Sequence, residues 1–306
     1  MAAKGFKYLA CTAFFSSFLA VSGLCIAEDL KTVEVWKNLF TVVNGDGVDS
    51  NTIFLITRDG VVVVDTRVTP NEAEKVLVEI RKQTNLAIVY TINTHYHGDH
   101  TFGNQIFQSS GPIIAHENVR RSLSGDSGKD HLGSFNSRNI HELDKTVVTP
   151  PTIVFKDEME IFLGGYSLRL IHVRGHTDGD LFIYIKELKT LITGDLVVYK
   201  KIPDMSDAYI EDWISAMNKL GNLDAEIYIP GHGDPGGKPV LLAMRHYLFN
   251  LKTLVLKGLE EGKSLKETQD AARPVLIKKY KSWENLDLID ANIQRAYLEY
   301  SLRKAS

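Results

Sequence analysis

The stretch TINTHYHGDHTFGN, residues 91–104, decides how the rest of this chain is interpreted. It crowds three of the chain's ten histidines and one aspartate into six positions, namely His95, His97, Asp99 and His100. An apolar run predicted to be a strand, residues 86–92, precedes them directly. Extended backbone points residues two apart the same way, so His95 and His97 are expected to face one point. Imidazole and carboxylate at a strand end favour a metal site, but four groups on one loop do not make a catalyst.

Three more residues of metal-ligand type stand in the same context. His176 lies in LIHVRGHTDGD, Asp195 in TLITGDLVV and His232 in AEIYIPGHGDPGG. Each follows a predicted strand and is preceded by Gly, which lets backbone approach closely. Ordinary core or surface histidine is a reasonable alternative for His97 alone, but not for the whole set. Seven such groups are too many for one tetrahedral zinc and suit two metals about 3.5–4 Å apart.

The choice of metal follows from the ligand types. Both cysteines, Cys11 and Cys25, lie near the amino terminus, outside all four motifs. Imidazole with carboxylate and no thiolate predicts two Zn²⁺ ions, with manganese or iron as alternatives.

The remainder alternates predicted strands with helices in two series. The first has strand-like segments at 32–43 and 51–66, a helix at 69–82 and the strand at 86–92. After a polar stretch at 122–150, the second has strands at 152–155, 158–162, 167–173, 181–185 and 190–194, a helix at 209–220 and a strand at 225–230. Two such series predict an α/β (α+β) fold of two packed sheets with helices outside.

Helical patterns fill the carboxyl-terminal part. The spacing predicts a helix at 239–257, a second that opens with a capping box at Ser264 and Glu267, and a last one striped by Ile289 and Ile293. We therefore expect a catalytic domain over 28–238 and a C-terminal helical extension, 239–306, packed on it.

The first residues read as a signal peptide. Lys4 and Lys7 precede an apolar run with small residues near its end, which predicts a leader over 1–27 cleaved after Ala27. A membrane anchor is the alternative, but Ser, Thr and Gly interrupt the run and a polar segment follows at once. The expected location is periplasmic or secreted, without stable membrane anchoring after cleavage.

Composition narrows the partners. The 306 residues are 44% hydrophobic and 24% charged, with a formal charge of -3, as in ordinary globular proteins. No basic face is expected, so nucleic acid is a poor candidate partner. A small-molecule carbonyl substrate is predicted instead, and the sequence does not specify an oligomeric state.

Over roughly residues 31–235 the chain resembles the metallo-β-lactamase superfamily. The resemblance rests on the motif HYHGDH and on the later motifs Gly-His176, Gly-Asp195 and Gly-His232, in which Gly stands directly before the ligand residue. The resemblance implies a four-layer αββα sandwich and a dinuclear metal site. It also implies a ligand set: His95, His97 and His176 for the first metal, Asp99, His100 and His232 for the second, and Asp195 between them. Asp65, which ends the run VVVVD, is by the same resemblance a structural residue below the site.

Details of the motifs indicate which branch of this superfamily the chain resembles most. Where this chain has Asp195, the β-lactamases that use a Cys ligand have that Cys, so the chain resembles glyoxalase II-type dizinc hydrolases and lactonases more. Iron-dependent oxygen reductases of the same fold have Glu in place of His97, so His97 argues against that branch. The segment 191–233, with Pro203, Trp213 and PGHG, resembles exported quinoprotein relay system zinc metallohydrolases.

The predicted function is that of an exported dizinc metallohydrolase. In the expected mechanism a metal-bridging hydroxide attacks the carbonyl of a small ester, lactone or thioester. Asp99 is the predicted catalytic residue, because its carboxylate can orient the nucleophile and collect its proton. The alternatives are a metallo-β-lactamase that hydrolyses β-lactam antibiotics and a periplasmic redox-pathway binding component with little turnover.

Overall fold

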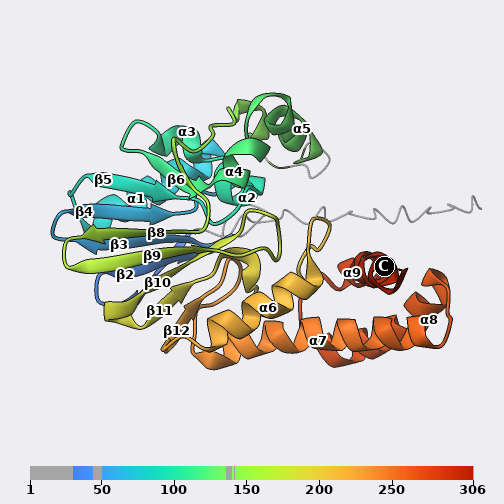
Figure 1. The fold of residues 1–306 in the computed structure, drawn as a ribbon. Coiled ribbons are helices and arrows are strands. Elements are labelled where there is room, and N and C mark those ends of the chain that lie inside the picture. Colours follow the sequence, from blue (N-terminus) through green and yellow to red (C-terminus); the bar gives the residue numbers. More distant parts are fainter. Residues whose placement is uncertain (1–29, 44–49, 136–139, 141, 306) are drawn as a thin grey trace, which may run out of the picture.

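The computed structural model describes residues 30–43, 50–135, 140 and 142–305, so the predicted signal peptide at 1–27 lies outside it. The described chain forms two sheets with helices on both outer faces (Figure 1). The first sheet has seven strands, in this order: β1 (Lys31–Trp36), β2 (Leu39–Val43), β3 (Thr52–Thr57), β4 (Gly60–Val64), β5 (Ile88–Ile92), β6 (Ile113–His116) and β7 (Ile153–Phe155). The second has five: β12 (Ile227–Ile229), β11 (Thr190–Ile192), β10 (Leu181–Ile185), β9 (Tyr166–His172) and β8 (Glu158–Leu163).

Both sheets are mixed. Strands β1 to β4 pair antiparallel and β4 to β7 pair parallel. In the second sheet β8 to β11 are antiparallel, and β12 joins β11 in parallel. The helices are α1 (Pro70–Gln83), α2 (Gly98–Thr101), α3 (Asn104–Phe107), α4 (Glu117–Ser122), α5 (Gly125–Phe135), α6 (Ile210–Gly221), α7 (Lys238–Glu260), α8 (Leu265–Tyr280) and α9 (Ile289–Ala305).

Alternation along the strands builds the layers. In β3, Ile53 points into the core between the sheets, whereas Phe54 packs on the other face with Val76 of α1. In the core between the sheets, Ile53 and other side chains of the first sheet pack with side chains of the second, such as Leu170 and Ile183. Burying each such side chain stabilises the fold by about 1.5–3 kcal/mol. The layers are helix, sheet, sheet and helix, which confirms the predicted αββα sandwich.

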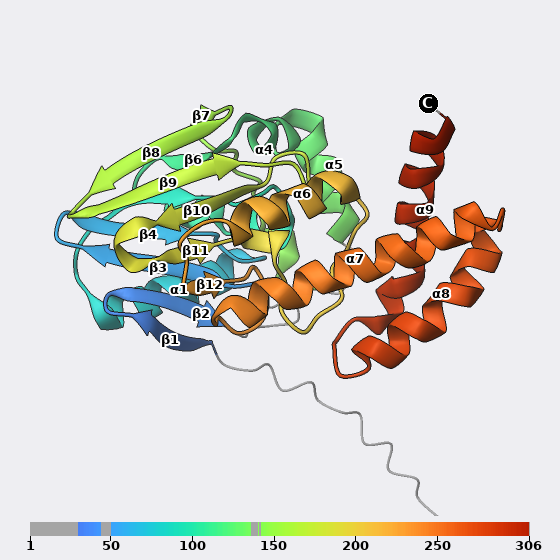
Figure 2. The same cartoon turned by 60° about the horizontal axis from the view of Figure 1, so that its bottom comes forward.

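The outer face of the second sheet is covered by α6 and by the carboxyl-terminal helices. One core cluster joins Phe182 of β10, Trp213 of α6, Leu248 of α7, Leu276 of α8 and Ile293 of α9. Helix α7 contacts β12 and leads to α8 and α9, which pack together with it at one end of the molecule (Figure 2). The predicted helical extension is confirmed, and its core is continuous with that of the sandwich. The boundary at residue 238 stays a prediction.

Three local features differ from the predictions. The strand-like segment 32–43 is a hairpin of two strands, because Asn38 adopts a left-handed conformation with φ 66°. Helix α5 lies inside the polar stretch 122–150, where no helix was predicted. Helix α4, directly after β6, was not predicted either. The capping box of Ser264 and Glu267 forms as predicted.

None of the helices that the structure describes has both the length and the apolar character needed to cross a membrane.

Candidate metal centre

All seven predicted ligand residues meet at the edge of the sandwich where their preceding strands end. The segment 95–100 follows β5, His176 follows β9, and His232 follows β12. Asp195 lies in a short 3₁₀ helix, η4 (Gly194–Leu196), after β11. Ligand atoms come within 4.8 Å of one another in three groups: His95, His97 and His176; His95, His100 and Asp195; Asp99, His100 and His232.

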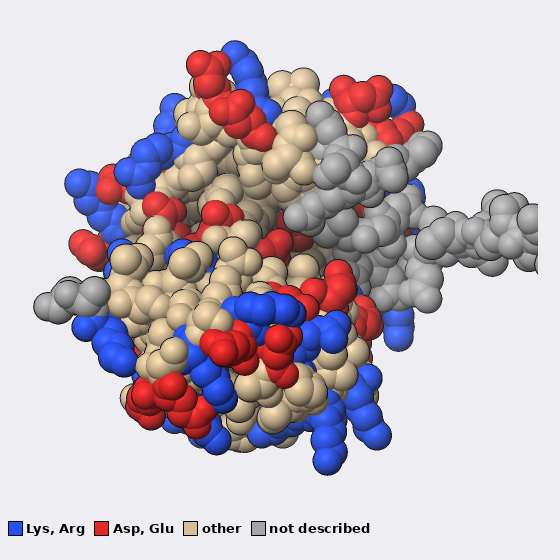
Figure 3. Space-filling model, turned by 90° about the vertical axis from the view of Figure 1, so that its right-hand side faces the viewer, with Lys and Arg blue, Asp and Glu red and all other residues tan. Residues whose placement is uncertain are grey.

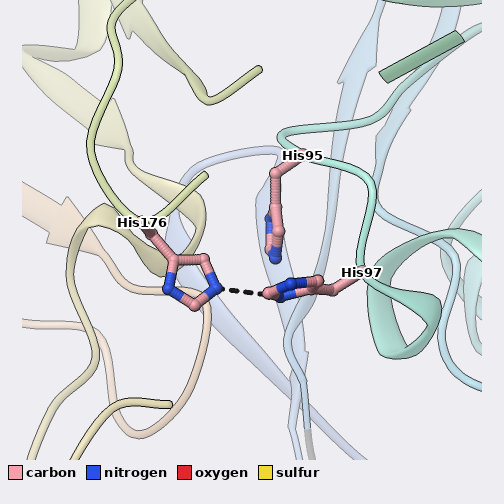
Figure 4. A group of neighbouring side chains, drawn as sticks. All are labelled: His95, His97 and His176. Atoms are coloured by element: carbon pink, nitrogen blue, oxygen red, sulfur yellow. Dashed lines mark hydrogen bonds between the residues drawn. The ribbon is translucent and has the colours of Figure 1, made fainter. Parts of the chain in front are cut away.

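The three histidines of the first group converge on one point (Figure 4). Nε2 of His176 lies 2.9 Å from Nδ1 of His97. The ring centroids of His95 and His97 are 4.8 Å apart, with the ring planes at 78°, and the two side chains reach the same point from different directions. His95 and His176 are buried, and His97 is partly exposed.

The second group lies beside the first. Oδ2 of Asp99 is 3.1 Å from Nε2 of His232, and that nitrogen is 3.4 Å from Nε2 of His100. Oδ2 of Asp195 lies 3.3 Å from His232 and 3.6 Å from His176, so this carboxylate stands between the two groups.

Asp65 supports the site from below, as the resemblance implied. It is buried, with φ 61°, at the end of β4. Its carboxylate accepts hydrogen bonds from the backbone and hydroxyl of Thr94, at 2.8 and 2.7 Å, and lies 2.8 Å from Nδ1 of His100. The Asp65 contact to Nδ1 directs Nε2 of His100 into the cluster.

Sequence reasoning missed Asp207. One oxygen of this residue lies 3.1 Å from Nε2 of His97 and accepts a hydrogen bond of 2.7 Å from the Tyr96 hydroxyl. The hydrogen bond from His97 lowers the pKa of Asp207, so its carboxylate stays ionised. Asp207 lies in an irregular loop, away from any strand end, so neither spacing nor a neighbouring Gly marks it.

Close backbone approach explains the Gly before His232. A Cβ on Gly231 would lie 1.8 Å from Oδ1 of Asp195, which no side chain tolerates. Gly194, before Asp195, adopts φ +50°, and a Cβ there would meet Thr94 at 2.5 Å. Both glycines are therefore required by the packing of the site's loops.

The electrostatics of the cluster suit cations. Burial alone would raise the pKa of Asp99, but His100 and His232 outweigh it and hold that pKa well below its usual value. Burial would also raise the pKa of Asp195, and the same two histidines lower it. Burial, aided by His97, lowers the pKa of His176 to about 4, so this imidazole is neutral at neutral pH. Ionised Asp99 and Asp195 beside a neutral His176 are protonation states that metal ligands need. Burial would lower the pKa of His100, but the carboxylates of Asp195 and Asp99 raise it well above its usual value, so a metal ion bound there would displace a proton.

One nitrogen gives a direct test of the fit. Nε2 of His95 is buried and makes no hydrogen bond to any part of the chain that the structure describes. An unpaired buried polar group costs about 1–3 kcal/mol. A metal ion held by His95 would satisfy this nitrogen, and the surrounding donor set, imidazole and carboxylate without sulfur, fits zinc. Residues and metal therefore fit.

Viewed from the side where α5 and α9 lie, the molecular surface is hollowed, and acidic side chains lie within the hollow (Figure 3).

A family model described as the metallo-beta-lactamase superfamily matches residues 45–232. A linear primary-alkylsulfatase of a Pseudomonas species is 24% identical over 215 residues, which cover 58% of this chain and 40% of that protein. A metallo-beta-lactamase type 2 of a Bacillus species is 27% identical over 207 residues, which cover 65% of this chain and 72% of that protein. The chain thus spans less than half of the alkylsulfatase.

Among solved structures, a metallo-beta-lactamase from Pontibacter korlensis has a similar fold. Its TM-score is 0.60 at 21% identity, over 72% of this chain and 99% of that one. The likeness concerns the sandwich, beyond which α7 to α9 pack together.

Proposed function

Because the chain belongs to the metallo-beta-lactamase superfamily, we propose that it is an exported dizinc metallohydrolase that cleaves a small ester, lactone or thioester. The observation that carries the proposal is the convergence of seven imidazole and carboxylate groups from four loops within the matched residues 45–232. The whole set lies beyond the carboxyl ends of strands, the edge of an α/β sheet at which ligands commonly bind.

We assign ligand roles to these residues by their grouping. His95, His97 and His176 would hold one ion, Asp99, His100 and His232 the other, and Asp195 would contact both. When bound, two zinc ions would supply Lewis acidity and a low-pKa water. Manganese or iron would suit the same nitrogen and oxygen donors.

Asp99 is the proposed catalytic residue. Its ionised carboxylate can accept the proton of the attacking water and pass it to the leaving group. The Ser50 hydroxyl donates to the Asp99 backbone carbonyl, which fixes this residue's backbone at the start of α2. An anchored base adds no reorganisation cost when the proton moves.

The residue between the two groups of ligands favours an ester, lactone or thioester as the bond that is cleaved. Asp195 would supply an oxygen ligand at that position, as in the glyoxalase II-type and lactonase branches that the sequence resembles. A second candidate is β-lactam hydrolysis, which is supported by the relatives named metallo-beta-lactamase type 2. The alkylsulfatase adds a sulfate ester as a bond to test.

Export is part of the proposal. It rests on the leader pattern of residues 1–27, in which Lys4 and Lys7 precede an apolar run. Mass determination of the protein recovered from a periplasmic extract would test cleavage after Ala27.

The function is tested with residues 28–306 loaded with zinc. Initial rates are measured on an aryl ester, a lactone, a thioester, a β-lactam and an alkyl sulfate, with and without a chelator. Chelator-sensitive turnover of one of the first three supports the proposal and names the bond. β-Lactam turnover at about 10⁴ M⁻¹s⁻¹ or above would put the second candidate first. Two bound metals without turnover of any substrate would favour a binding component instead.

A further inference from the structure

The segment 199–209 joins the loop of Asp195 to α6 and contains Asp207. The two ring nitrogens of His97 face different neighbours: Nδ1 lies 2.9 Å from His176, and Nε2 lies 3.1 Å from Asp207. A carboxylate on the outer nitrogen of a metal-binding imidazole fixes its tautomer and its orientation. The position of the Asp207 backbone therefore affects which way His97 points.

Helix α9 anchors this segment on both sides of Asp207. The Asn292 side-chain amide donates to the Pro203 carbonyl at 2.9 Å. The Arg295 guanidinium donates twice to the Ala208 carbonyl, once from Nε at 2.8 Å. Pro203 and Ala208 are buried, so these carbonyls depend on protein donors.

A third residue of α9 anchors the helix that follows the segment. Glu299 accepts hydrogen bonds from the backbone N–H groups of Ile210, at 2.8 Å, and Glu211, at 3.1 Å. The first N–H groups of a helix have no partner within it, and the N-cap residue Tyr209 supplies no side-chain bond. Asn292, Arg295 and Glu299 are three and four positions apart and hence lie on one face of α9.

We propose that α9 positions Asp207, and through it His97, so that the C-terminal extension sets how tightly the site binds metal. The inference rests on the proposed metal site. The family match ends at residue 232, so α9 lies outside the matched part of the chain. Asp207 and Arg295 are positioning residues, because neither is among the seven assigned ligands.

A purely structural role for Arg295 predicts that the effects of R295M and D207N on zinc affinity add. Its guanidinium also lies 5.9 Å from the Tyr209 ring, so losing it lowers stability by either account. If Arg295 acts through Asp207, however, R295M weakens zinc binding only while the Asp207 carboxylate is present. Removing a carboxylate that orients a metal-binding histidine costs about 10–100-fold in affinity. Residues that act in one chain of contacts give non-additive effects.

The experiment is a double-mutant cycle on residues 28–306. Zinc dissociation constants of wild type, R295M, D207N and R295M/D207N are measured by competition with a chromophoric chelator, and melting temperatures are recorded in parallel. We expect R295M and D207N each to weaken binding about 10-fold or more, and the double variant to match D207N. The R295K variant retains a donor and should recover part of the affinity; it replaces R295M in the cycle if R295M does not fold.

K304M is the matched control. Lys304 lies on the same helix and also donates to a backbone carbonyl, that of Leu259 at 3.1 Å, but not to the segment 199–209. It should keep wild-type affinity. R295M binding as tightly as wild type, or R295M and D207N adding fully, would overturn the inference. Wild-type protein that binds no zinc would instead overturn the proposed function.

Discussion

Asp99 combines a buried position with an ionised carboxylate, since its neighbours His100 and His232 outweigh the effect of burial on its pKa. We expect D99N to keep the fold, because the side chain retains its shape, and to lose about 10²–10⁴ of kcat/KM, because the amide cannot accept the proton. Initial rates and circular dichroism measure both. D130N, at an exposed position of α5, is the control and should be unchanged. Wild-type turnover by D99N would remove Asp99 from the catalytic role.

The sequence predicted some residues of the site and missed another, for a physical reason. His176, Asp195 and His232 each follow an apolar strand and a Gly, and that local context could be read directly. Asp207 contacts His97 across 110 positions from an irregular segment. Such a contact depends on how the chain closes in space, and no local pattern encodes it. The ligand roles remain predictions until metal binding is measured.

His116 gives a prediction about pH. It is buried at the end of β6, stacks on His172 with ring centroids 3.6 Å apart, and accepts the backbone N–H of Asn118. Burial and His172 lower its pKa to about 4. The unfolded value is about 6.5, so the folded chain binds fewer protons between the two values. The resulting stability is present above about pH 6.5 and is lost as the pH falls towards 4.

H116N should lose less stability on acidification than wild type. Asn cannot titrate there, and it retains an oxygen to accept the N–H of Asn118 at the start of α4. Urea midpoints at about pH 7 and about pH 4.5 give the comparison. H246N, at an exposed position of α7, should follow wild type. Equal acid losses in wild type and H116N would refute the assignment.

At the scale of elements, the turn after β12 leaves almost no room for a side chain at Gly231. We expect G231A to abolish high-affinity zinc binding, because its Cβ would stand 1.8 Å from Oδ1 of Asp195 and displace that loop. Zinc stoichiometry after dialysis measures the effect. G133A is the matched control, since a Cβ on Gly133 of α5 meets nothing within 4 Å. G231A protein that retains two zinc ions would show that the loop can shift without loss of the site.

Periodicity predicted most elements, and the exceptions are instructive. Helix α7 was recognised from residues such as Val240, Met244 and Leu251 at helical spacing, all of which are buried. Helix α5 was not, because only Gly128 and Phe135 are buried among its described side chains and Gly, Ser and Asp dominate it. The division of 32–43 into two strands depends on the left-handed Asn38, which an apolar pattern does not reveal.

For the molecule as a whole, the continuous core predicts a single unfolding transition. Leu251 of α7 is fully buried in the cluster that joins the extension to the second sheet. L251A should lower the free energy of unfolding by about 2–5 kcal/mol and shift one transition, seen equally by fluorescence and circular dichroism. L302A, on α9 and 73% exposed, should stay within about 0.5 kcal/mol of wild type. Two separate transitions, only one of them moved by L251A, would support 28–238 and 239–306 as independent units.

The crowding of His95, His97, Asp99 and His100 into six positions also affects the denatured ensemble. These four groups stay neighbours along the chain after every sheet has come apart, so a denatured molecule keeps a multidentate segment. Zinc that binds the denatured chain as well as the native one stabilises folding by less than its native affinity implies. Excess zinc during refolding would therefore bind that segment and slow folding. The yield of refolded protein should be highest when the metal is added after the sandwich has formed.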